Sequence, residues 1–361
     1  MTSTALLIND TSEAYHWGCY ATATEIRLTL EESGYAVSSI PVADIHNLSP
    51  GPLAEPQFSD EGFRRAFLHD NPDIAGQLEK ADIVVVNGEG TLHGLRRASF
   101  NLLYLIRLAD AVFGKPVAVI NTSVFPYGNG AHDDGAARLY RTMLGSADHL
   151  IVRESASLGV AETCGLEATL SFDCLPRYWA RTGPPDTTAA QSGEVILGGG
   201  FGLTPEVMLT LLEGAKDILR GYTLVYVTGA NGQPANDDTP FIEVLKASRL
   251  NIEHRVTASF EDWRSTIANA DALISGRFHH TIAAACAGTP AVVFAAGTPK
   301  NTGLCEALDL PAPLAATPDA ALDFAARVEQ ALSKQAQTVS KSTRQALTDR
   351  AAANFRFLER L

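Results

Sequence analysis

The stretch ISGRFHHTIAAACAGTPAVVF, from Ile274 to Phe294, contains an apolar segment, a polar turn, a run of small residues and a second apolar segment. Residues 271–276 and 290–294 have the length and apolar character of buried strands, and the residues between them are predicted to form a helix. The small side chains of residues 283–287 would let that helix lie close to a sheet. A strand, a helix and a strand joined by short turns place the two strands in parallel. The stretch therefore predicts a parallel α/β fold.

The same alternation of strand and helix continues along most of the chain. Further strands are predicted at residues 4–10, 35–42, 82–90, 116–123, 149–155, 194–202 and 222–229. Further helices are predicted at residues 19–33, 99–113, 135–146, from 204 onward, and 260–270, with two Ala-rich amphipathic helices after Pro318. Residues 47–62 are rich in Pro, Gly and polar side chains and are predicted to form a loop. Alternating strands and helices indicate a doubly wound α/β fold, with a parallel sheet covered on both faces.

The alternation stops once, at LPRYWARTGPPDTTAAQSG, residues 175–193, and then restarts. We interpret this segment as an interdomain linker. The predicted organisation is two Rossmann-like domains, residues 1–180 and 190–315, followed by C-terminal helices over residues 316–361. Ligands of such sheets bind beyond the carboxyl ends of the strands. We therefore expect the glycine-rich strand ends of both domains to face one cleft.

Composition narrows the classes of function. The chain has 361 residues, of which 46% are hydrophobic and 19% charged, so it can bury a sizeable core. Its formal net charge of −13 argues against a non-specific nucleic-acid binder and against a basic membrane-surface protein. Any site for an anion must therefore be a local positive region in a negative molecule.

The five cysteines are scattered and show no Cys-x-x-Cys spacing, which is typical of reduced thiols and predicts neither a disulfide framework nor a zinc site. The segment AHDDG, residues 131–135, has metal-ligand composition but is typical of a solvated turn, so no metal is expected. The first residues, MTSTALLIND, lack the features of a signal peptide, and no run of 18 apolar residues occurs. These observations predict a cytoplasmic protein.

The turn Ser275-Gly276-Arg277-Phe278-His279-His280 follows a predicted strand and opens a predicted helix. The first N–H groups of a helix favour phosphate or carboxylate binding. Arg277 can bind an oxyanion through two parallel hydrogen bonds, and either His279 or His280 can move a proton near neutral pH. The alternative is a surface arginine and two solvated histidines on an ordinary turn. One of the two histidines is expected to be structural, and the spacing does not decide which.

The segment NGEGTLHG, residues 87–94, is the corresponding feature of the first half. Its glycines allow the backbone to approach a ligand closely. Glu89 could take a proton from a hydroxyl or hydrogen-bond to it, and His93 could orient the same group. The alternative is a glycine turn that only closes the strand–helix link. The spacing matches neither a dinucleotide fingerprint nor a P-loop.

Several other residues lie at the ends of predicted strands or just beyond them. They are Gly199 and Gly200 in the run GGGFG, Arg153 in the segment IVRES, and His16, Asn9 and Asn121. Each could line the predicted cleft. Each also has a structural alternative, which is a plain turn for the glycines and an ion pair for Arg153.

Taken in order, these motifs resemble the polysaccharide pyruvyl transferase family. The resemblance covers about residues 5–310 and is most specific in SGRFHH followed by the A-x-x-x-G-x-P pattern near residues 283–290. Arg277 and His279 match the arginine and histidine of that motif, and Arg153 matches the arginine of the family's V-R-[DE] segment. Two features depart from the family pattern, namely Glu89 within the first glycine motif and the looser NDTSEAYHWG near the N-terminus.

The resemblance implies a fold like that of GT-B glycosyltransferases and phosphoenolpyruvate as co-substrate, with no cofactor and no metal. The product would be a pyruvate ketal on two hydroxyls of a sugar. Arg153 and Arg277 would bind the donor, with Ser275, Gly276, His280, Gly199 and Gly200 around it. His279 would handle the proton, and Glu89 would be a candidate base for the acceptor hydroxyl. His93, His16, Asn9 and Asn121 would contact the acceptor.

Two other functions remain open at this stage. The architecture also permits a glycosyltransferase that uses a nucleotide sugar, or a catalytically silent family member that binds a glycan. The expected partners are phosphoenolpyruvate and a sugar, glycan or lipid-linked saccharide. Membrane contact would be peripheral at most, nucleic acid is not expected, and a homo-oligomer is possible.

Overall fold

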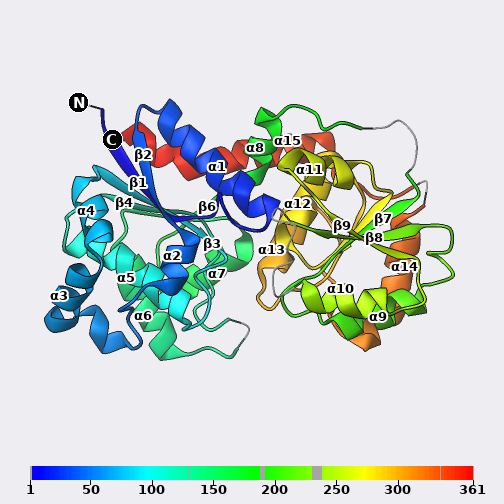
Figure 1. The fold of residues 1–361 in the computed structure, drawn as a ribbon, viewed down its shortest axis with the longest axis horizontal. Coiled ribbons are helices and arrows are strands. Elements are labelled where there is room, and N and C mark those ends of the chain that lie inside the picture. The colour runs from blue at the N-terminus through cyan, green and yellow to red at the C-terminus, as the bar shows by residue number, and fades with distance from the viewer. Residues whose placement is uncertain (1, 129, 188–191, 230–237, 334, 361) are drawn as a thin grey trace. The chain divides into compact units, whose positions relative to one another are not determined.

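The computed structural model describes residues 2–128, 130–187, 192–229, 238–333 and 335–360 (Figure 1). The chain divides into two compact units. Unit 1 comprises residues 1–13, 22–174 and 350–361, and unit 2 comprises residues 14–21 and 175–349.

Unit 1 is built on a six-stranded sheet with the strand order β2-β1-β3-β4-β5-β6, in which all paired strands are parallel. The strands are β1 Thr4–Asp10, β2 Ala36–Pro41, β3 Ile83–Glu89, β4 Val117–Thr122, β5 His149–Val152 and β6 Thr169–Leu170. The helical elements of this half are α1 Trp17–Glu32, α2 Val42–Asn47, η1 Glu55–Phe58, α3 Glu61–Asp70, α4 Pro72–Lys80, α5 Arg97–Ala111, α6 Asp134–Leu144 and α7 Ser155–Thr163.

Both faces of this sheet are buried. Along β1, Leu6 and Ile8 lie in one hydrophobic cluster, whereas Ala5 and Leu7 lie in another, because successive side chains of a strand point to opposite faces. Apolar residues at consecutive positions are the expected pattern for a parallel sheet with helices on both sides. The second cluster also contains Phe355 from the end of the chain.

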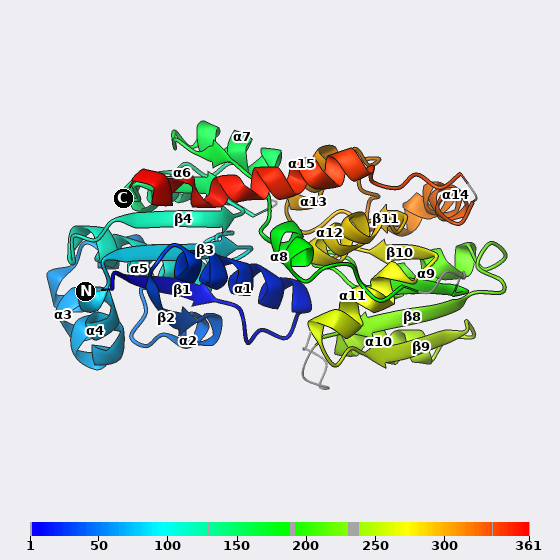
Figure 2. The same cartoon turned by 90° about the horizontal axis from the view of Figure 1, so that it is seen from above.

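Unit 2 is built on a five-stranded parallel sheet with the order β11-β10-β7-β8-β9 (Figure 2). The strands are β7 Glu194–Gly198, β8 Thr223–Thr228, β9 Ile252–Val256, β10 Ala272–Ser275 and β11 Ala291–Val293. The helical elements are α8 Leu175–Arg181, α9 Pro205–Gly214, α10 Thr239–Lys246, α11 Phe260–Ala268, α12 Phe278–Ala287, α13 Lys300–Leu308, η2 Pro318–Ala320, α14 Ala321–Ala331 and α15 Lys341–Ala351, with η3 Ala352–Arg360 after them in unit 1.

The stretch from Ile274 to Phe294 forms the predicted strand, helix and strand. β10 and β11 pair in parallel, and α12 connects them. The helix ends at Gly288, whose φ of +84° is readily adopted by glycine and lets the chain leave the helix. Thr204 is the N-cap residue of α9, and its side chain accepts a hydrogen bond from the Val207 N–H.

Several segments differ from the prediction. The predicted loop at residues 47–62 contains η1 and the start of α3, and the predicted linker at residues 175–193 begins with α8. Residues 188–191 of that linker lie outside the described residues. Helices α4, α7, α10 and α13 were not predicted, because their 8 or 9 residues are too few for the sequence pattern to separate them from loops.

The residue ranges of the two units also differ from the predicted domain ranges. The start of α1 lies in unit 2, and its remainder lies in unit 1. The predicted tail at residues 316–361 is divided in the same way, since residues 350–361 belong to unit 1 and the preceding residues belong to unit 2.

Candidate functional site

The carboxyl ends of β10 and β7 position the central residues of unit 2. Arg277 is the N-cap residue of α12 and has extended backbone, with φ −83° and ψ 126°. Ser275, the last residue of β10, accepts a hydrogen bond from the Arg277 N–H at 3.0 Å through its hydroxyl. The predicted strand–turn–helix motif therefore places an arginine next to the N-terminus of a ten-residue helix.

The Arg277 guanidinium is held by two side chains from other parts of unit 2. Nη2 donates to Asp238 Oδ1 at 2.6 Å, and Nη1 donates to His16 Nε2 at 2.8 Å. The Tyr226 hydroxyl also donates to Asp238 Oδ1, at 2.6 Å. Asp238 is almost fully buried, whereas the Arg277 side chain keeps 13% of its surface exposed. The arginine is thus fixed in direction while part of it still reaches the surface.

The two adjacent histidines have different surroundings. His279 is half-buried, and its Nδ1 lies 3.7 Å from Cys19 Sγ. His280 is buried, and its ring centroid lies 5.6 Å from that of Trp263. Burial lowers the pKa of His280 well below its usual range, and Arg277 and His279 lower it further. His280 is therefore a neutral core residue, and His279 is the better placed of the two for chemistry.

His16 belongs to this cluster. The sequence predicts it among the acceptor contacts of the first domain, but the structure places it beside Arg277 in unit 2. Desolvation lowers the pKa of His16 well below its usual range, and the charge of Arg277 adds to that effect. A neutral imidazole can accept the hydrogen bond from the guanidinium, as the geometry requires.

The glycines after β7 let the strand ends approach one another. A Cβ at Gly200 would lie 2.6 Å from the Gly276 Cα, and one at Gly199 would lie 2.8 Å from the Tyr226 hydroxyl. The Gly276 N–H donates to the Gly199 carbonyl at 3.0 Å. The absence of a side chain is therefore required by packing within the protein, and contact of these glycines with a donor stays a prediction.

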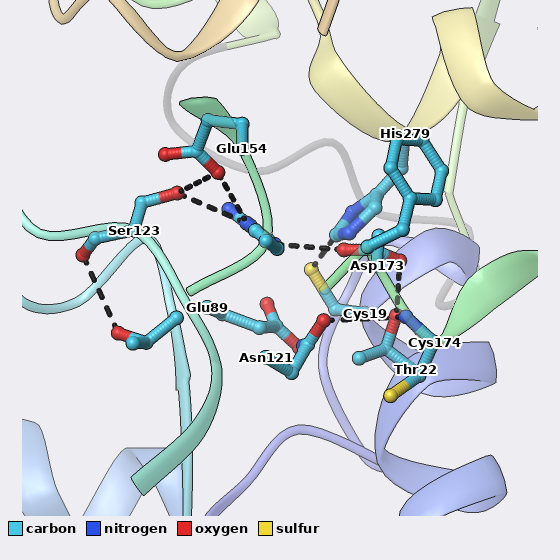
Figure 3. A network of polar contacts seen from close by, with 12 residues as sticks. Cys19, Thr22, Glu89, Asn121, Ser123, Glu154, Asp173, Cys174 and His279 are labelled. Carbon is cyan, nitrogen blue, oxygen red and sulfur yellow. Dashed lines mark hydrogen bonds and ion pairs between the residues drawn. The ribbon is translucent and has the colours of Figure 1, made fainter. Parts of the chain in front are cut away.

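Arg153, at the end of β5 in unit 1, is surrounded by acidic side chains. Its Nη1 donates to Asp173 Oδ2 at 2.9 Å, its Nε donates to Ser123 Oγ at 2.9 Å, and Glu154 Oε2 lies 3.6 Å from Nε. Figure 3 shows Ser123, Glu154 and Asp173 within this network. Burial opposes the charged form, but Asp173, Glu154 and Glu89 raise the pKa of Arg153 above its usual value.

The charges around Arg153 matter for its predicted role. The arginine is 2% exposed, and three carboxylates lie close enough to act on its charge. One positive charge among three formally negative groups is a poor site for a further anion. The structure therefore favours an internal ion-pair role for Arg153 over a donor contact.

Glu89 closes β3 in an unusual backbone conformation. Its φ is +36°, and Asn9 and Asn121, which lie at corresponding places on β1 and β4, have φ of 65° and 50°. Residues other than glycine in this region cost on the order of 1–3 kcal/mol each and cluster at functional sites. The edge of the unit 1 sheet thus carries three strained residues on neighbouring strands.

A buried amide network links these three residues. Asn9 Nδ2 donates to the Asn87 carbonyl at 2.7 Å, and Asn121 Nδ2 donates to Asn87 Oδ1 at 2.9 Å. Glu89 Oε1 accepts from Thr11 Oγ1 at 2.6 Å and from Asn87 Nδ2 at 3.1 Å. All these hydrogen bonds are made between protein groups, and they fix the position of the Glu89 carboxylate.

His93 lies in the turn that follows β3. Its Nδ1 is 3.0 Å from the Gly90 carbonyl oxygen and 2.7 Å from Arg96 Nη2. These contacts orient the ring within its own turn. An acceptor contact for His93 stays a prediction.

Sequence reasoning missed several residues that complete the two clusters, namely Asp238, Tyr226, Cys19, Asn87 and Asp173. Tyr226 and Asn87 lie within predicted strands and carried no signal beyond being polar residues in apolar segments. Asp238 and Cys19 are distant in sequence from the residues they contact, so only folding could reveal them.

Across the part of the chain that is described, no group of three or more His, Cys, Asp or Glu side chains could hold a metal ion. Within the same residues, no helix has the length and apolar character needed to cross a membrane.

The fold and the site together define a two-unit α/β protein of the GT-B type, with polar clusters at the carboxyl edges of both parallel sheets. The chain belongs to the polysaccharide pyruvyl transferase family, whose model matches residues 26–297. A search of curated proteins gives no significant match.

Solved structures confirm the predicted fold class. The chain is similar to the UDP-GlcNAc 2-epimerase of Methanocaldococcus jannaschii, with a TM-score of 0.59, 12% identity and 100% of each chain covered. It is also similar to HepE of Anabaena in complex with UDP and glucose, with a TM-score of 0.59, 10% identity, and 99% of this chain and 98% of that chain covered. At such low identity the likeness concerns the fold alone.

Proposed function

We propose that this protein transfers the pyruvyl group of phosphoenolpyruvate onto two hydroxyls of a sugar or glycan and forms a ketal. Family membership supports a transferase of this kind. The observation that carries the proposal is the position of Arg277, a fixed guanidinium at the N-terminus of α12 with His279 in the first turn of the helix. A cation, a helix N-terminus and an imidazole are the groups that an anionic enol ester requires.

Donor binding is assigned to unit 2. The Arg277 guanidinium and the first N–H groups of α12 would bind one anionic group of the donor, and Ser275 and Gly276 form the turn that presents them. Lys300, the first residue of α13, is a second cation, and its Nζ lies 5.9 Å from the ring centroid of Phe278. In this assignment Arg153 shapes the end of β5 and does not bind the donor.

The proposed chemistry begins with a proton. His279 gives a proton to the methylene carbon of the enol, which leaves C2 electrophilic. One sugar hydroxyl adds to C2 and loses its proton to a base, for which Glu89 is our candidate. The second hydroxyl then bonds to C2 and returns its proton to His279 as the C–O bond to phosphate breaks. Inorganic phosphate leaves, and the ketal remains.

A second candidate function is glycosyl transfer from a nucleotide sugar. It is favoured by the similarity in fold to structures solved with UDP. A catalytically silent, glycan-binding member of the family is the non-enzymatic alternative. We place both below pyruvyl transfer because family membership points to that reaction.

Calorimetric titration with phosphoenolpyruvate, UDP-sugars and CMP-sugars tests the identity of the donor. We expect binding of phosphoenolpyruvate, and binding of a nucleotide sugar alone would reject the proposal. Phosphate release on adding phosphoenolpyruvate with a panel of saccharides then separates an enzyme from a binding protein. Donor binding with no phosphate release from any acceptor of the panel would favour the silent family member.

We also propose that the protein acts in the cytoplasm. The five cysteines are scattered along the sequence and show no Cys-x-x-Cys spacing, which is typical of a reducing compartment. An acceptor on a lipid carrier would require only peripheral contact with a membrane.

A further inference from the structure

The segment from Tyr15 to Tyr20, although it comes early in the chain, packs against several elements of unit 2. Trp17 Nε1 donates to Thr257 Oγ1 at 2.9 Å. The Tyr15 carbonyl oxygen is so close to Gly229 that a Cβ there would lie 1.9 Å from it. The Tyr20 ring lies near Phe260, with centroids 6.3 Å apart. The segment is therefore a fixed part of the cluster around Arg277 and His279.

Gly18 provides the space that His279 occupies. A Cβ at Gly18 would lie 2.2 Å from the His279 Cβ and 2.4 Å from its Cγ. These atoms form the base of the imidazole side chain, so they cannot move aside without moving the whole ring. The first turn of α1 and the first turn of α12 thus approach closely enough for the backbone of one to limit the side chain of the other.

Cys19, the next residue, faces the same ring. Its Sγ lies 3.7 Å from His279 Nδ1, which is within hydrogen-bonding distance for sulfur (Figure 3). A thiol is a weak donor, and an unprotonated Nδ1 can accept from it. In that arrangement the ring proton resides on Nε2, the nitrogen that does not face the thiol.

We propose that Gly18 and Cys19 are positioning residues for His279. Gly18 fixes where the ring lies, and the Cys19 thiol donates to Nδ1. When Nε2 gives its proton to the donor, the thiol proton passes to Nδ1 and leaves a thiolate, so that the ring is neutral before and after the step. The functional part of this inference rests on the proposed function, because it uses His279 as the proton donor. The orientation and the tautomer of the ring are independent of any reaction.

The experiment compares Cys19→Ala, Cys19→Ser and Gly18→Ala with two controls in the same unit. Gly214→Ala is the glycine control, since the added Cβ would meet nothing within 4 Å beyond its chain neighbours and its own helix backbone, and Cys286→Ala is the half-buried cysteine control. Nitrogen-15 NMR of the histidine rings reads the tautomer of His279, assigned by the signal lost in His279→Gln. Phosphate release from phosphoenolpyruvate gives kcat, and thermal unfolding checks the fold of each variant.

We expect a single Nε2-protonated signal for His279 in the wild type and a shifted, averaged signal in Cys19→Ala. Serine offers a stronger donor and should restore the wild-type ring signal in part. We expect kcat to fall about 10-fold in Cys19→Ala and about 100-fold in Gly18→Ala, because small displacements of a reacting group have effects of this order. Both controls should keep wild-type kcat and ring signals.

Unchanged ring signals in both Cys19→Ala and Gly18→Ala overturn the positioning role, as does a wild-type signal that shows the proton on Nδ1. If the wild type releases no phosphate with any acceptor, the proposed function fails, and the ring signals still decide the inference. If one variant does not fold, the tautomer of His279 in the wild type and the ring signal of the other variant still test the positioning role.

Discussion

Arg153 and Arg277 both lie where a parallel strand ends, yet their surroundings differ. Arg153 is 2% exposed and lies among Asp173, Glu154 and Glu89. Arg277 is partly exposed at the start of α12, and its neighbours include one carboxylate, that of Asp238, and the neutral imidazoles of His16 and His280. A motif that contains an arginine therefore does not by itself define an anion site. The charges packed around the guanidinium decide whether it can bind a ligand.

The carboxyl edges of the two sheets also differ. In unit 1, strained residues and an amide network hold a buried carboxylate, that of Glu89, at the end of β3. In unit 2, glycine contacts bring the ends of β7 and β10 together and leave the cationic and imidazole side chains at a helix N-terminus. In the proposed function, the first edge would accept hydrogen bonds from hydroxyls and the second would bind an anion.

The largest expected effect concerns Arg277. Replacing it in Arg277→Ala should lower the rate of phosphate release by about 10²- to 10⁴-fold, because the fixed charge at the helix N-terminus is lost. Steady-state phosphate release measures the change. Arg220→Ala, which removes an exposed arginine of the same unit, is the matched control and should keep full activity. Wild-type activity in Arg277→Ala would show that the comparison assigns the wrong arginine.

Replacing Arg153 should mainly lower the stability of the fold. Arg153→Ala removes the partner of Asp173 and Glu154 and should lower the free energy of unfolding by about 3–5 kcal/mol, since a buried charge left without its partner is costly. Urea denaturation measures this loss. A smaller loss is expected for Arg277→Ala, because among the described residues one carboxylate, that of Asp238, loses its cation there, and the Tyr226 hydroxyl still donates to it. An Arg153→Ala protein of wild-type stability that no longer binds phosphoenolpyruvate would return Arg153 to the donor site.

Replacing Gly200 should have an intermediate effect on the free energy of unfolding. Gly200→Ala places a Cβ against the backbone of Gly276 and should cost about 1–3 kcal/mol of unfolding free energy, as overpacking does. Gly214→Ala, which adds its Cβ in open space, should change stability by less than about 0.5 kcal/mol. Denaturant titration of the two variants checks the contrast. Equal stabilities would mean that the strand ends separate easily.

The smallest effect is the pH dependence from the neutral histidines. The pKa values of His16 and His280 are lowered in the folded state relative to 6.5, so the unfolded chain binds more protons below that pH. Stability should therefore fall as the pH drops below 6.5, by up to about 1.4 kcal/mol per pH unit for each histidine. His46 and His254 add to the same trend.

A comparison of His280→Gln with the wild type isolates one of these protons. Urea denaturation from neutral pH to mildly acidic pH should give a shallower loss of unfolding free energy for the variant. The same pH dependence in both proteins would show that His280 does not resist protonation in the folded state.

Local patterns were enough to predict much of the fold. The apolar runs at β1, β3 and β4 have the length and composition of buried strands, and the glycine at residue 288 marks the end of α12. The predicted loop at residues 47–62 was less accurate, because its short helical turns carry little periodicity. The positions of Arg277 and His279 at the start of a helix were predictable, because they follow a strand and open a helix, which is a local arrangement.

By itself, the sequence determined the alternation of strands and helices, the parallel sheets and the position of Arg277 at a helix N-terminus, since all of these depend on residues close together in the chain. The tertiary structure alone decided that Asp238 and His16 hold Arg277, that Cys19 faces His279, and that Arg153 lies among carboxylates. Contacts of this kind join residues far apart in the chain. Burial and local charge, which set the pKa of each group, exist only after these residues have packed together.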